Sequence, residues 1–165
     1  MILAIDVYYD EDSAKVAGVL FDWSDTAPQS TVTTIVQDVA PYQSGQFYKR
    51  ELPCILKLLE QVDLSLLDGI LVDSHVYVSN EKAYGLGGHL WDALDGAVSV
   101  IGVAKRGFHA TEKVSIPITR GQSANPLFVS AVGMEAEEAA RLVEAMHGSY
   151  RIPDLLKAVD QLSRS

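Results

Sequence analysis

The first nine residues, MILAIDVYY, constrain the fold more than any other segment of this 165-residue chain. Apolar residues 2–5 precede Asp6, and a β-branched and aromatic run follows it, which is typical of a buried strand. An ionised carboxylate in such a strand is costly to desolvate unless a positive charge meets it. We therefore expect Asp6 either to lie at an exposed rim or to bind a cation.

Two further acids stand in comparable apolar settings: Asp73 ends the segment GILVD, and Glu51 lies in YKRELP. We group them with Asp6 as a candidate metal site, because converging carboxylates can hold one or two Mg²⁺ or Mn²⁺ ions through oxygen ligands. Such an ion lowers the pKa of a bound water and stabilises the attacking and leaving oxygens of a phosphodiester. Lys105, which ends the segment AVSVIGVAK, is either a solvent-facing lysine or a group that neutralises transition-state charge.

The composition favours one domain over residues 1–165, because the chain is 48% apolar and long enough for a substantial core. We find no apolar run of membrane-spanning length, and no basic segment of the kind that begins a signal peptide. The single cysteine, Cys54, can form no internal disulfide and is expected in the core. These features favour a cytoplasmic location.

The net charge of −9 weighs against extensive binding of a phosphate backbone, for which a basic surface is the usual requirement. Two Lys-Arg pairs, at residues 49–50 and 105–106, can still form a local basic patch. The simpler interpretation is that the acidic surface only keeps the protein in solution.

Three strands are predicted in the first 40 residues. They cover residues 1–9, 14–23 and 30–40, which are rich in β-branched and aromatic residues and are separated by short polar turns. Short turns of this kind join antiparallel neighbours. The chain is therefore expected to begin with an antiparallel meander.

The pattern then changes to helices that alternate with short apolar strands. Helical spacing predicts a helix over residues 51–62, with Pro53 in its first turn, and a second helix over 81–94. Strands at 66–74 and 97–105 lack alternation, as expected when both faces of a strand are covered and its neighbours run parallel. Right-handed crossovers would join them into a partly parallel sheet.

The last third of the chain is predicted to add two strands and two helices. The strands, at residues 113–121 and 126–133, are expected at the edge or periphery of the sheet, and the helices cover 135–147 and 153–163. Three apolar residues are expected on the inward face of the last helix: Leu156, Val159 and Leu162.

This order of elements resembles the ribonuclease H-like architecture, an α/β fold with a mixed sheet in which a three-strand antiparallel meander is followed by βαβαβ, flanked by helices. In that architecture the first strand carries an aspartate at its middle, and the next parallel strand delivers another acid from its C-terminal end. Asp6 and Asp73 occupy those two places. Because ligands of open α/β sheets gather outside the strand ends, the fold would bring both acids to a binding site.

Six short motifs occur in one order along nearly the whole chain: PYQSG at 41–45, RELP at 50–53, LVD at 71–73, IGVAK at 101–105, VS at 129–130 and YRIP at 150–153. They resemble the PYIPG, RExP, VDG, GVAK, VS and YRxP segments of endonuclease V, a metal-dependent nuclease of DNA repair that cuts near deoxyinosine. The resemblance implies a nuclease that uses Mg²⁺ or Mn²⁺ and binds nucleic acid, either DNA or RNA, in a deaminated or structured form.

The resemblance also implies roles for individual residues. Asp6, Glu51 and Asp73 match the metal-binding acids of the family, and Lys105 matches its strand-end lysine, so these four residues are the expected catalytic set. Tyr8 matches the family's strand-one aromatic and is expected to pack beside the site.

Four residues are expected to contact the substrate: Tyr42, Gly45, Arg50 and His75. Tyr42 matches the aromatic residue of the loop that wedges into the DNA strands, and Gly45 ends the same loop motif. Arg50 is expected to support this loop or a phosphate. His75 follows Asp73 by two residues, so it is either an ordinary loop histidine or a group that reaches the cleft to bind metal or assist proton transfer.

The chain also departs from the family pattern. Ser74 and Val76 replace glycines that let the extruded base approach the backbone, and a Cβ at either place should crowd that pocket. Met134 stands where the family has a histidine. The sequence also begins at the first strand, without the N-terminal helical segment usual in the family. We therefore expect a divergent, N-terminally shorter member whose specificity for inosine has changed.

Three functions are consistent with these residues. The first is a metal-dependent endonuclease that hydrolyses phosphodiester bonds, as the acids indicate. The second is a non-catalytic relative that binds nucleic acid or a protein partner, as the replaced glycines and histidine indicate. The third is a metal-dependent hydrolase of a small phosphorylated molecule, which would need less basic surface.

Overall fold

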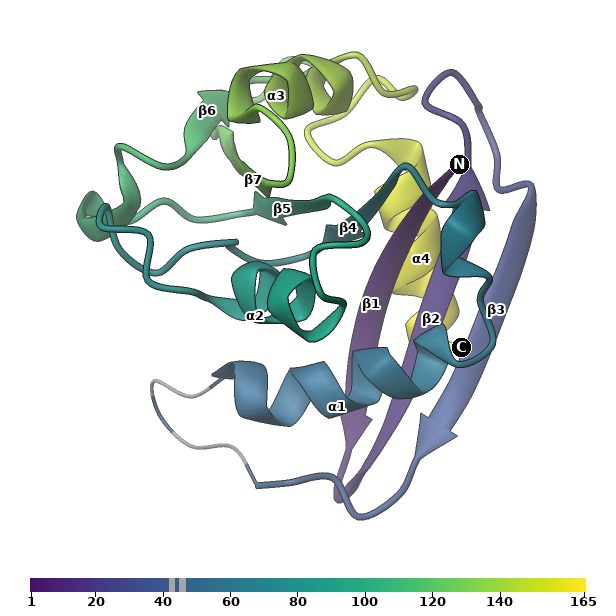
Figure 1. Cartoon of the computed structure of the whole chain (residues 1–165). Helices are drawn as coiled ribbons and strands as arrows, with labels where there is room; N and C mark the ends of the chain where they lie inside the picture. Colours follow the sequence, from purple (N-terminus) through teal and green to yellow (C-terminus); the bar gives the residue numbers. More distant parts are fainter. Residues whose placement is uncertain (42–43, 45–46) are drawn as a thin grey trace.

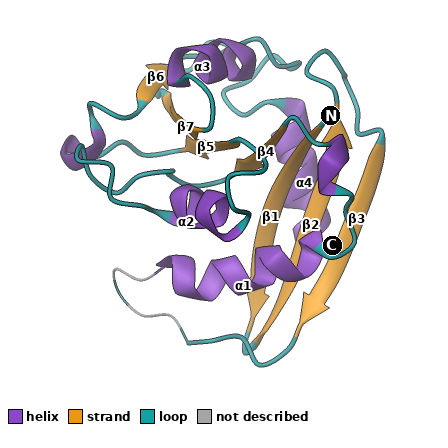
Figure 2. Cartoon of the chain, viewed as in Figure 1, coloured by secondary structure: helices purple, strands orange, loops and turns teal. Residues whose placement is uncertain are grey.

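The computed structural model describes residues 1–41, 44 and 47–165. A seven-stranded sheet forms its centre, with the strand order β3-β2-β1-β4-β5-β7-β6. Helices lie on both faces of this sheet (Figures 1 and 2). Within the part of the chain that the structure describes, no helix is long and apolar enough to cross a membrane.

The first three strands form the predicted meander. β1 (Ile2–Asp10) and β2 (Ser13–Phe21) pair antiparallel through a tight turn in which Glu11 has a positive φ of 56°. β3 (Ser30–Val36) pairs antiparallel with β2 and ends four residues before its predicted end. This part of the fold was predictable because each strand carries its own β-branched pattern and each turn is short.

The middle strands run parallel, as their continuous burial predicts. β4 (Gly69–Val72) pairs with β1, and β5 (Val100–Ala104) pairs with β4, both in the parallel sense. β7 (Leu127–Val132) then pairs antiparallel with β5, and β6 (Ile116–Ile118) forms the outer edge beside β7. The predicted mixed α/β sheet, with the last two strands at its edge, is therefore confirmed.

Two helices cover each face of the sheet. α1 (Phe47–Leu59) and α2 (Leu86–Ala93) lie in front of the sheet in the view of Figure 1, whereas α4 (Asp154–Arg164) lies behind it. α3 (Ala136–Glu144) packs on the same side as α4, against the β6–β7 edge. The core is consequently split into two apolar layers, one on each face of the sheet.

The alternation of β1 assigns its residues to these two layers. Leu3 and Ile5 point into the layer under α1 and α2, whereas Ile2 and Ala4 point into the layer under α3 and α4. The next residue in the second series is Asp6. Its carboxylate therefore faces α4.

Two helices begin at different residues from those predicted. α1 begins at Phe47, four residues before the predicted start, so Pro53 lies inside the helix and the prediction that it occupies the first turn was wrong. The buried apolar face of α1 outweighs the one backbone hydrogen bond that an interior proline removes. α2 begins at Leu86 and not at residue 81, because Lys82 has a positive φ of 66° and Tyr84 forms a bridge to an earlier residue.

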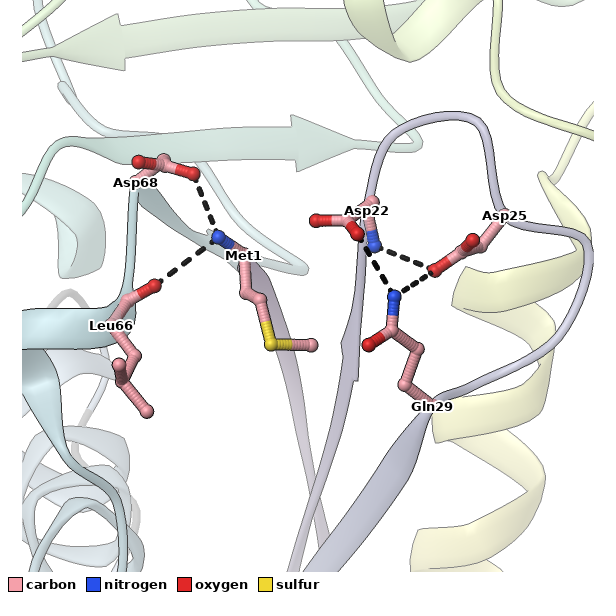
Figure 3. A network of polar contacts seen from close by, with 6 residues as sticks. All are labelled: Met1, Asp22, Asp25, Gln29, Leu66 and Asp68. Carbon is pink, nitrogen blue, oxygen red and sulfur yellow. Dashed lines mark hydrogen bonds and ion pairs between the residues drawn. The ribbon is translucent and has the colours of Figure 1, made fainter.

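Polar contacts fix the chain at the start of β1 and in the turn between β2 and β3 (Figure 3). The amino group of Met1 donates hydrogen bonds to the Asp68 carboxylate at 2.7 Å and to the Leu66 carbonyl at 3.2 Å. In the turn, the side-chain amide of Gln29 donates to the Asp25 carboxylate at 2.7 Å. The first contact joins the start of β1 to the segment that leads into β4.

Candidate active site

Asp6 and Asp73 lie side by side at one end of the sheet. The parallel register pairs Ile5 of β1 with Val72 of β4. The residues that follow them are therefore neighbours: Asp6 lies in the middle of β1, and Asp73 comes directly after the end of β4. Both line the same cavity under α4. The structure therefore brings together the two acids that the sequence pattern singled out.

Lys105 reaches the same place from the next strand. It follows β5 directly, and its Nζ lies 3.6 Å from Oδ2 of Asp73. About half of each side chain is exposed, 53% for Lys105 and 48% for Asp73, so this ion pair contributes little to stability. The lysine is therefore available to contact a bound anion.

A cavity of about 300 Å³ lies between α4 and the sheet, at the middle of β1 and the C-terminal ends of β4 and β5. Its walls are mainly apolar and include Leu71, Val103, Leu127, Ile152 and Leu156. Seven polar or charged residues also line it: Asp6, Asp73, Lys105, Tyr150, Arg151, Lys157 and Asp160. Charged groups at the strand ends thus open onto an apolar space.

Asp160 of α4 belongs to this cluster, although the sequence analysis did not identify it. Its carboxyl group shares a hydrogen bond with that of Asp6, and Ser163 Oγ donates another to Asp6 Oδ2 at 3.1 Å. Leu156, Val159 and Leu162 pack against the core as predicted, but Leu156 and Leu162 are only partly buried. The residues of α4 that are fully buried are Leu155, Val159 and Ser163. The helix therefore directs a polar residue, Ser163, at Asp6.

The crowding of carboxylates changes the protonation of Asp6. Burial is the largest cause that raises the pKa of Asp6, and the neighbouring acids Asp160 and Asp73 add to it, so that the pKa reaches about 7. The pKa of Asp160 is lowered instead: burial opposes this shift, but the hydrogen bond from Asp6 and the nearby charge of Arg164 outweigh it. The proton shared by this pair therefore resides on the more buried Asp6.

Glu51 approaches from the opposite face of the sheet. It is only 9% exposed on α1, and the hydroxyl of Tyr9 donates a hydrogen bond to its Oε2 at 2.8 Å. Burial is the largest cause that raises the pKa of Glu51, and the charges of Asp6 and Asp73 raise it too. The hydrogen bond from Tyr9 lowers it, and the resulting pKa is about 7. The guanidinium of Arg50, which is expected to support a loop or a phosphate, lies 3.7 Å from the centre of the Tyr9 ring.

The donor set fits a hard divalent cation. Mg²⁺ is usually held by one or two carboxylates together with water and phosphate oxygens, and Asp6, Asp73 and Asp160 supply such carboxylates. Their mutual repulsion, which contributes to the raised pKa of Asp6, would be relieved by a cation. Among the described residues, however, no group of three or more His, Cys, Asp or Glu side chains is already placed to hold a metal ion. Glu51, the third acid expected at the site, accepts its hydrogen bond from Tyr9.

Three of the remaining predicted residues lie away from this cluster or outside the description. His75 Nε2 lies 2.9 Å from the carbonyl oxygen of Arg106, and His75 is not among the residues that line the cavity. Tyr42 and Gly45 lie outside the described residues. Tyr8, expected to pack beside the site, is 41% exposed, and the guanidinium of Arg164 lies 5.1 Å from the centre of its ring.

Two residues that replace a glycine or a histidine of the family pattern, Val76 and Met134, pack in the core. Val76 is fully buried in the layer under α2, so its side chain points into the core. Met134 packs against the layer under α3 and α4. His89, in α2, stacks on Tyr48 with the ring centres 3.7 Å apart.

The family model for endonuclease V matches residues 1–161. The chain belongs to the endonuclease V family. Endonuclease V of Streptomyces coelicolor is 28% identical over 99% of this chain and 78% of its own length. The membership inferred from the six motifs is thereby confirmed, and endonuclease V homologues are nucleases, a class of hydrolase.

Solved endonuclease V structures share the fold. The Streptomyces avermitilis enzyme superposes with a TM-score of 0.84 at 24% identity, covering 99% of this chain and 79% of that one. The Ciona intestinalis enzyme, solved in complex with a 24-mer DNA containing an inosine, gives 0.79 at 22% identity, covering 99% and 84%. The predicted ribonuclease H-like fold is confirmed.

Proposed function

We propose that this endonuclease V homologue is a Mg²⁺- or Mn²⁺-dependent endonuclease that hydrolyses phosphodiester bonds in nucleic acid. The observation that carries the proposal is the adjacency of Asp6, in the middle of β1, and Asp73, at the end of β4, with Lys105 3.6 Å from Asp73. Carboxylates and a cation placed in this way can hold a divalent ion and a phosphate side by side.

Each residue of the cluster has a part in the proposed reaction. Asp6 and Asp73 would bind the ion, which would supply an activated water and charge stabilisation at the phosphate. Asp6 must first lose its proton, because its pKa is about 7. Asp160 and Ser163 orient the Asp6 carboxylate through their hydrogen bonds, and Lys105 would contact a non-bridging phosphate oxygen.

Glu51 is the third proposed ligand. It reaches the end of the sheet from α1 and interacts electrostatically with both Asp6 and Asp73. Its pKa of about 7 means that it, too, is partly protonated near neutral pH. Ion binding should therefore strengthen as the pH rises through 7, because carboxylate ligands must be ionised.

The proposed substrate is a DNA or RNA strand. The Ciona relative is bound to inosine-containing DNA, and in this chain Lys105, Arg151 and Lys157 provide positive charge around the cavity despite the net charge of −9. Deaminated and structured strands are the first substrates to try.

One observation favours the non-catalytic alternative. Glu51 accepts a hydrogen bond from Tyr9. Among the described residues, it does not form a group with two other side chains that could hold a metal ion. If that arrangement persists when a cation is present, the cluster retains fewer ligands for it. The chain would then bind nucleic acid or a protein partner without cleaving.

A cleavage assay separates these functions. End-labelled 24-mers, single- and double-stranded and with or without inosine, would be incubated with the wild type, Asp73→Asn and the surface control Glu137→Gln in Mg²⁺ or Mn²⁺. We expect metal-dependent cleavage that falls by about 100-fold or more in Asp73→Asn and is unchanged in the control. Binding without cleavage by the wild type would support the non-catalytic alternative. Inhibition by a mononucleotide but not by an oligonucleotide would support a small phosphorylated substrate.

A further inference from the structure

We propose that the cavity under α4, with Tyr150 at its rim, binds one unpaired nucleobase of the substrate strand, next to the phosphodiester at Asp6 and Asp73. This inference rests on the proposed function, since it names a subsite for the same strand. It assigns a ligand to residues for which the cleavage chemistry has no role: Tyr150, Ile152 and Leu156.

The cavity has the size and lining of a site for a flat apolar ring. Its volume of about 300 Å³ lies at the lower end of the range for small-ligand sites. Val103 and Leu127 from the sheet form one wall, and Ile152 and Leu156 form the other. The last two side chains are only partly buried, so the cavity is accessible from the α4 side.

Tyr150 is an exposed aromatic residue on a fixed main chain. Its side chain is 73% exposed, yet its carbonyl accepts a 2.6 Å hydrogen bond from Nη1 of Arg120. Arg120 is itself 6% exposed and donates to four further carbonyls. Those acceptors are Glu144, Met146, Gly148 and Arg151. A buried guanidinium therefore sets the position of the segment that presents Tyr150.

The next residue fastens the same segment to the catalytic end of the sheet. Arg151 Nη2 donates to the carbonyl of Lys105 at 2.6 Å and to that of Pro126 at 2.9 Å, and its Nε donates to Asn125 at 3.0 Å. Tyr150 is thus held beside the residue that approaches Asp73. An aromatic ring held at a fixed place offers a stacking surface at a small entropic cost.

Three cationic side chains, of Lys105, Arg151 and Lys157, line the cavity together with the three carboxylates. Lys105 and Lys157 can contact the phosphates on either side of an inserted base, a contact that an uncharged apolar ligand would not make. Every base has a π face and can stack on a tyrosine, so this subsite would tolerate different sequences. A peptide side chain would use the apolar walls but not the two lysines.

The test is a binding titration with an abasic scan. Single-stranded 24-mers, each with one abasic position, would be titrated in EDTA by fluorescence anisotropy against the wild type, Tyr150→Ala, Tyr150→Phe and Leu156→Trp. The exposed apolar residue Leu66, far from the cavity, provides the control Leu66→Ala. Circular dichroism would verify that Leu156→Trp is folded, and Tyr150→Ala changes only an exposed side chain.

We expect Tyr150→Ala and Leu156→Trp to weaken binding of the intact strand by about 10-fold, and Tyr150→Phe by less than about 2-fold. One abasic position should weaken wild-type binding to a similar degree and cause no further loss in Tyr150→Ala.

Wild-type affinity in both Tyr150→Ala and Leu156→Trp, or additive losses at every abasic position, would overturn the subsite while leaving cleavage intact. A wild-type chain that binds no oligonucleotide would overturn the subsite and the proposed function together. If one abasic position has the same effect as Tyr150→Ala but the wild type cleaves no strand, the subsite is supported and only the proposed catalysis is contradicted.

Discussion

The hydroxyl of Tyr9 lies 2.8 Å from Oε2 of Glu51 and donates a hydrogen bond to it. This contact joins β1 to α1 on the face of the sheet opposite to Asp6. Since the bond favours the ionised carboxylate, Tyr9 lowers the pKa of Glu51, which burial has raised to about 7. Tyr9 therefore influences both the orientation and the charge of a proposed metal ligand.

Replacing Tyr9 by Phe should weaken cation binding at neutral pH. Without the hydroxyl, the pKa of Glu51 rises further above its ordinary value, so a larger fraction of Glu51 is protonated at pH 7. We expect the Mn²⁺ affinity of Tyr9→Phe to fall by about 3- to 10-fold at pH 7 and to recover at pH 9. Isothermal titration calorimetry at both pH values measures this. Tyr8→Phe is the matched control, and an affinity for Tyr9→Phe equal to the wild type at pH 7 would contradict the assignment.

Replacing Asp6 by Asn should stabilise the metal-free protein at alkaline pH. The pKa of Asp6 is about 7 in the folded state and 3.8 for an ordinary aspartate, so its contribution is fully present below pH 3.8 and is lost as the pH rises through 7. Asn cannot ionise, so the variant avoids this loss. We expect a gain of roughly 1–2 kcal/mol in the free energy of unfolding at pH 8 and almost none at pH 4.

Thermal unfolding in EDTA across pH 4 to 9 measures this difference, with Glu137→Gln as a surface control. The melting temperature of Asp6→Asn should rise above that of the wild type by a few degrees at pH 8. A difference that does not change with pH would show that Asp6 ionises without an energetic penalty. Added Mn²⁺ should stabilise the wild type more than the variant, because it binds the ionised carboxylate.

The two strand acids were predictable, whereas two of their partners were not. Asp6 interrupts an apolar strand and Asp73 follows the end of another, which are local signals, and parallel pairing of the two strands brings the acids together. Asp160 lies in an amphipathic helix, where one acid among many looks like a solvated surface residue. Asp160 and Ser163 are three residues apart and therefore lie on one side of the helix. This spacing would have placed Asp160 beside Asp6 only if the side of α4 that faces the sheet had been known.

Tyr9 escaped prediction for a related reason. Family resemblance singled out Tyr8, and strand alternation puts Tyr8 on the face of Asp6 but Tyr9 on the face of α1. The partner of Tyr9 is Glu51, 42 positions away in the chain. Only the packing of α1 on the sheet reveals this pair.

Replacing Lys105 by Ala should reduce activity without reducing stability. The ion pair with Asp73 is exposed, so its loss should change the free energy of unfolding by less than about 1 kcal/mol. The loss of positive charge at the phosphate should lower kcat by about 10²- to 10³-fold. Single-turnover cleavage and thermal unfolding measure the two effects, and Lys113→Ala is the control. Unchanged cleavage by Lys105→Ala would exclude the lysine from the reaction.

Replacing Arg120 by Met should strongly destabilise the protein. The buried guanidinium donates to five main-chain carbonyls between Glu144 and Arg151, and a methionine would leave these acceptors without a donor. We expect a loss of about 3–5 kcal/mol in the free energy of unfolding, measured by urea denaturation. Arg141→Met, on the exposed surface of α3, should cost less than about 0.5 kcal/mol. Equal effects of the two variants would mean that the carbonyls find other donors.

The central claim is that Asp6 and Asp73 bind a divalent cation at the end of the sheet. Titration calorimetry of Mn²⁺ at pH 8 into the wild type, Asp6→Asn and Asp73→Asn tests it most directly, with circular dichroism to verify folding. We predict saturable binding by the wild type that is weakened at least about 10-fold in each variant. No binding by the folded wild type at millimolar Mn²⁺, or equal binding by all three proteins, would contradict the claim.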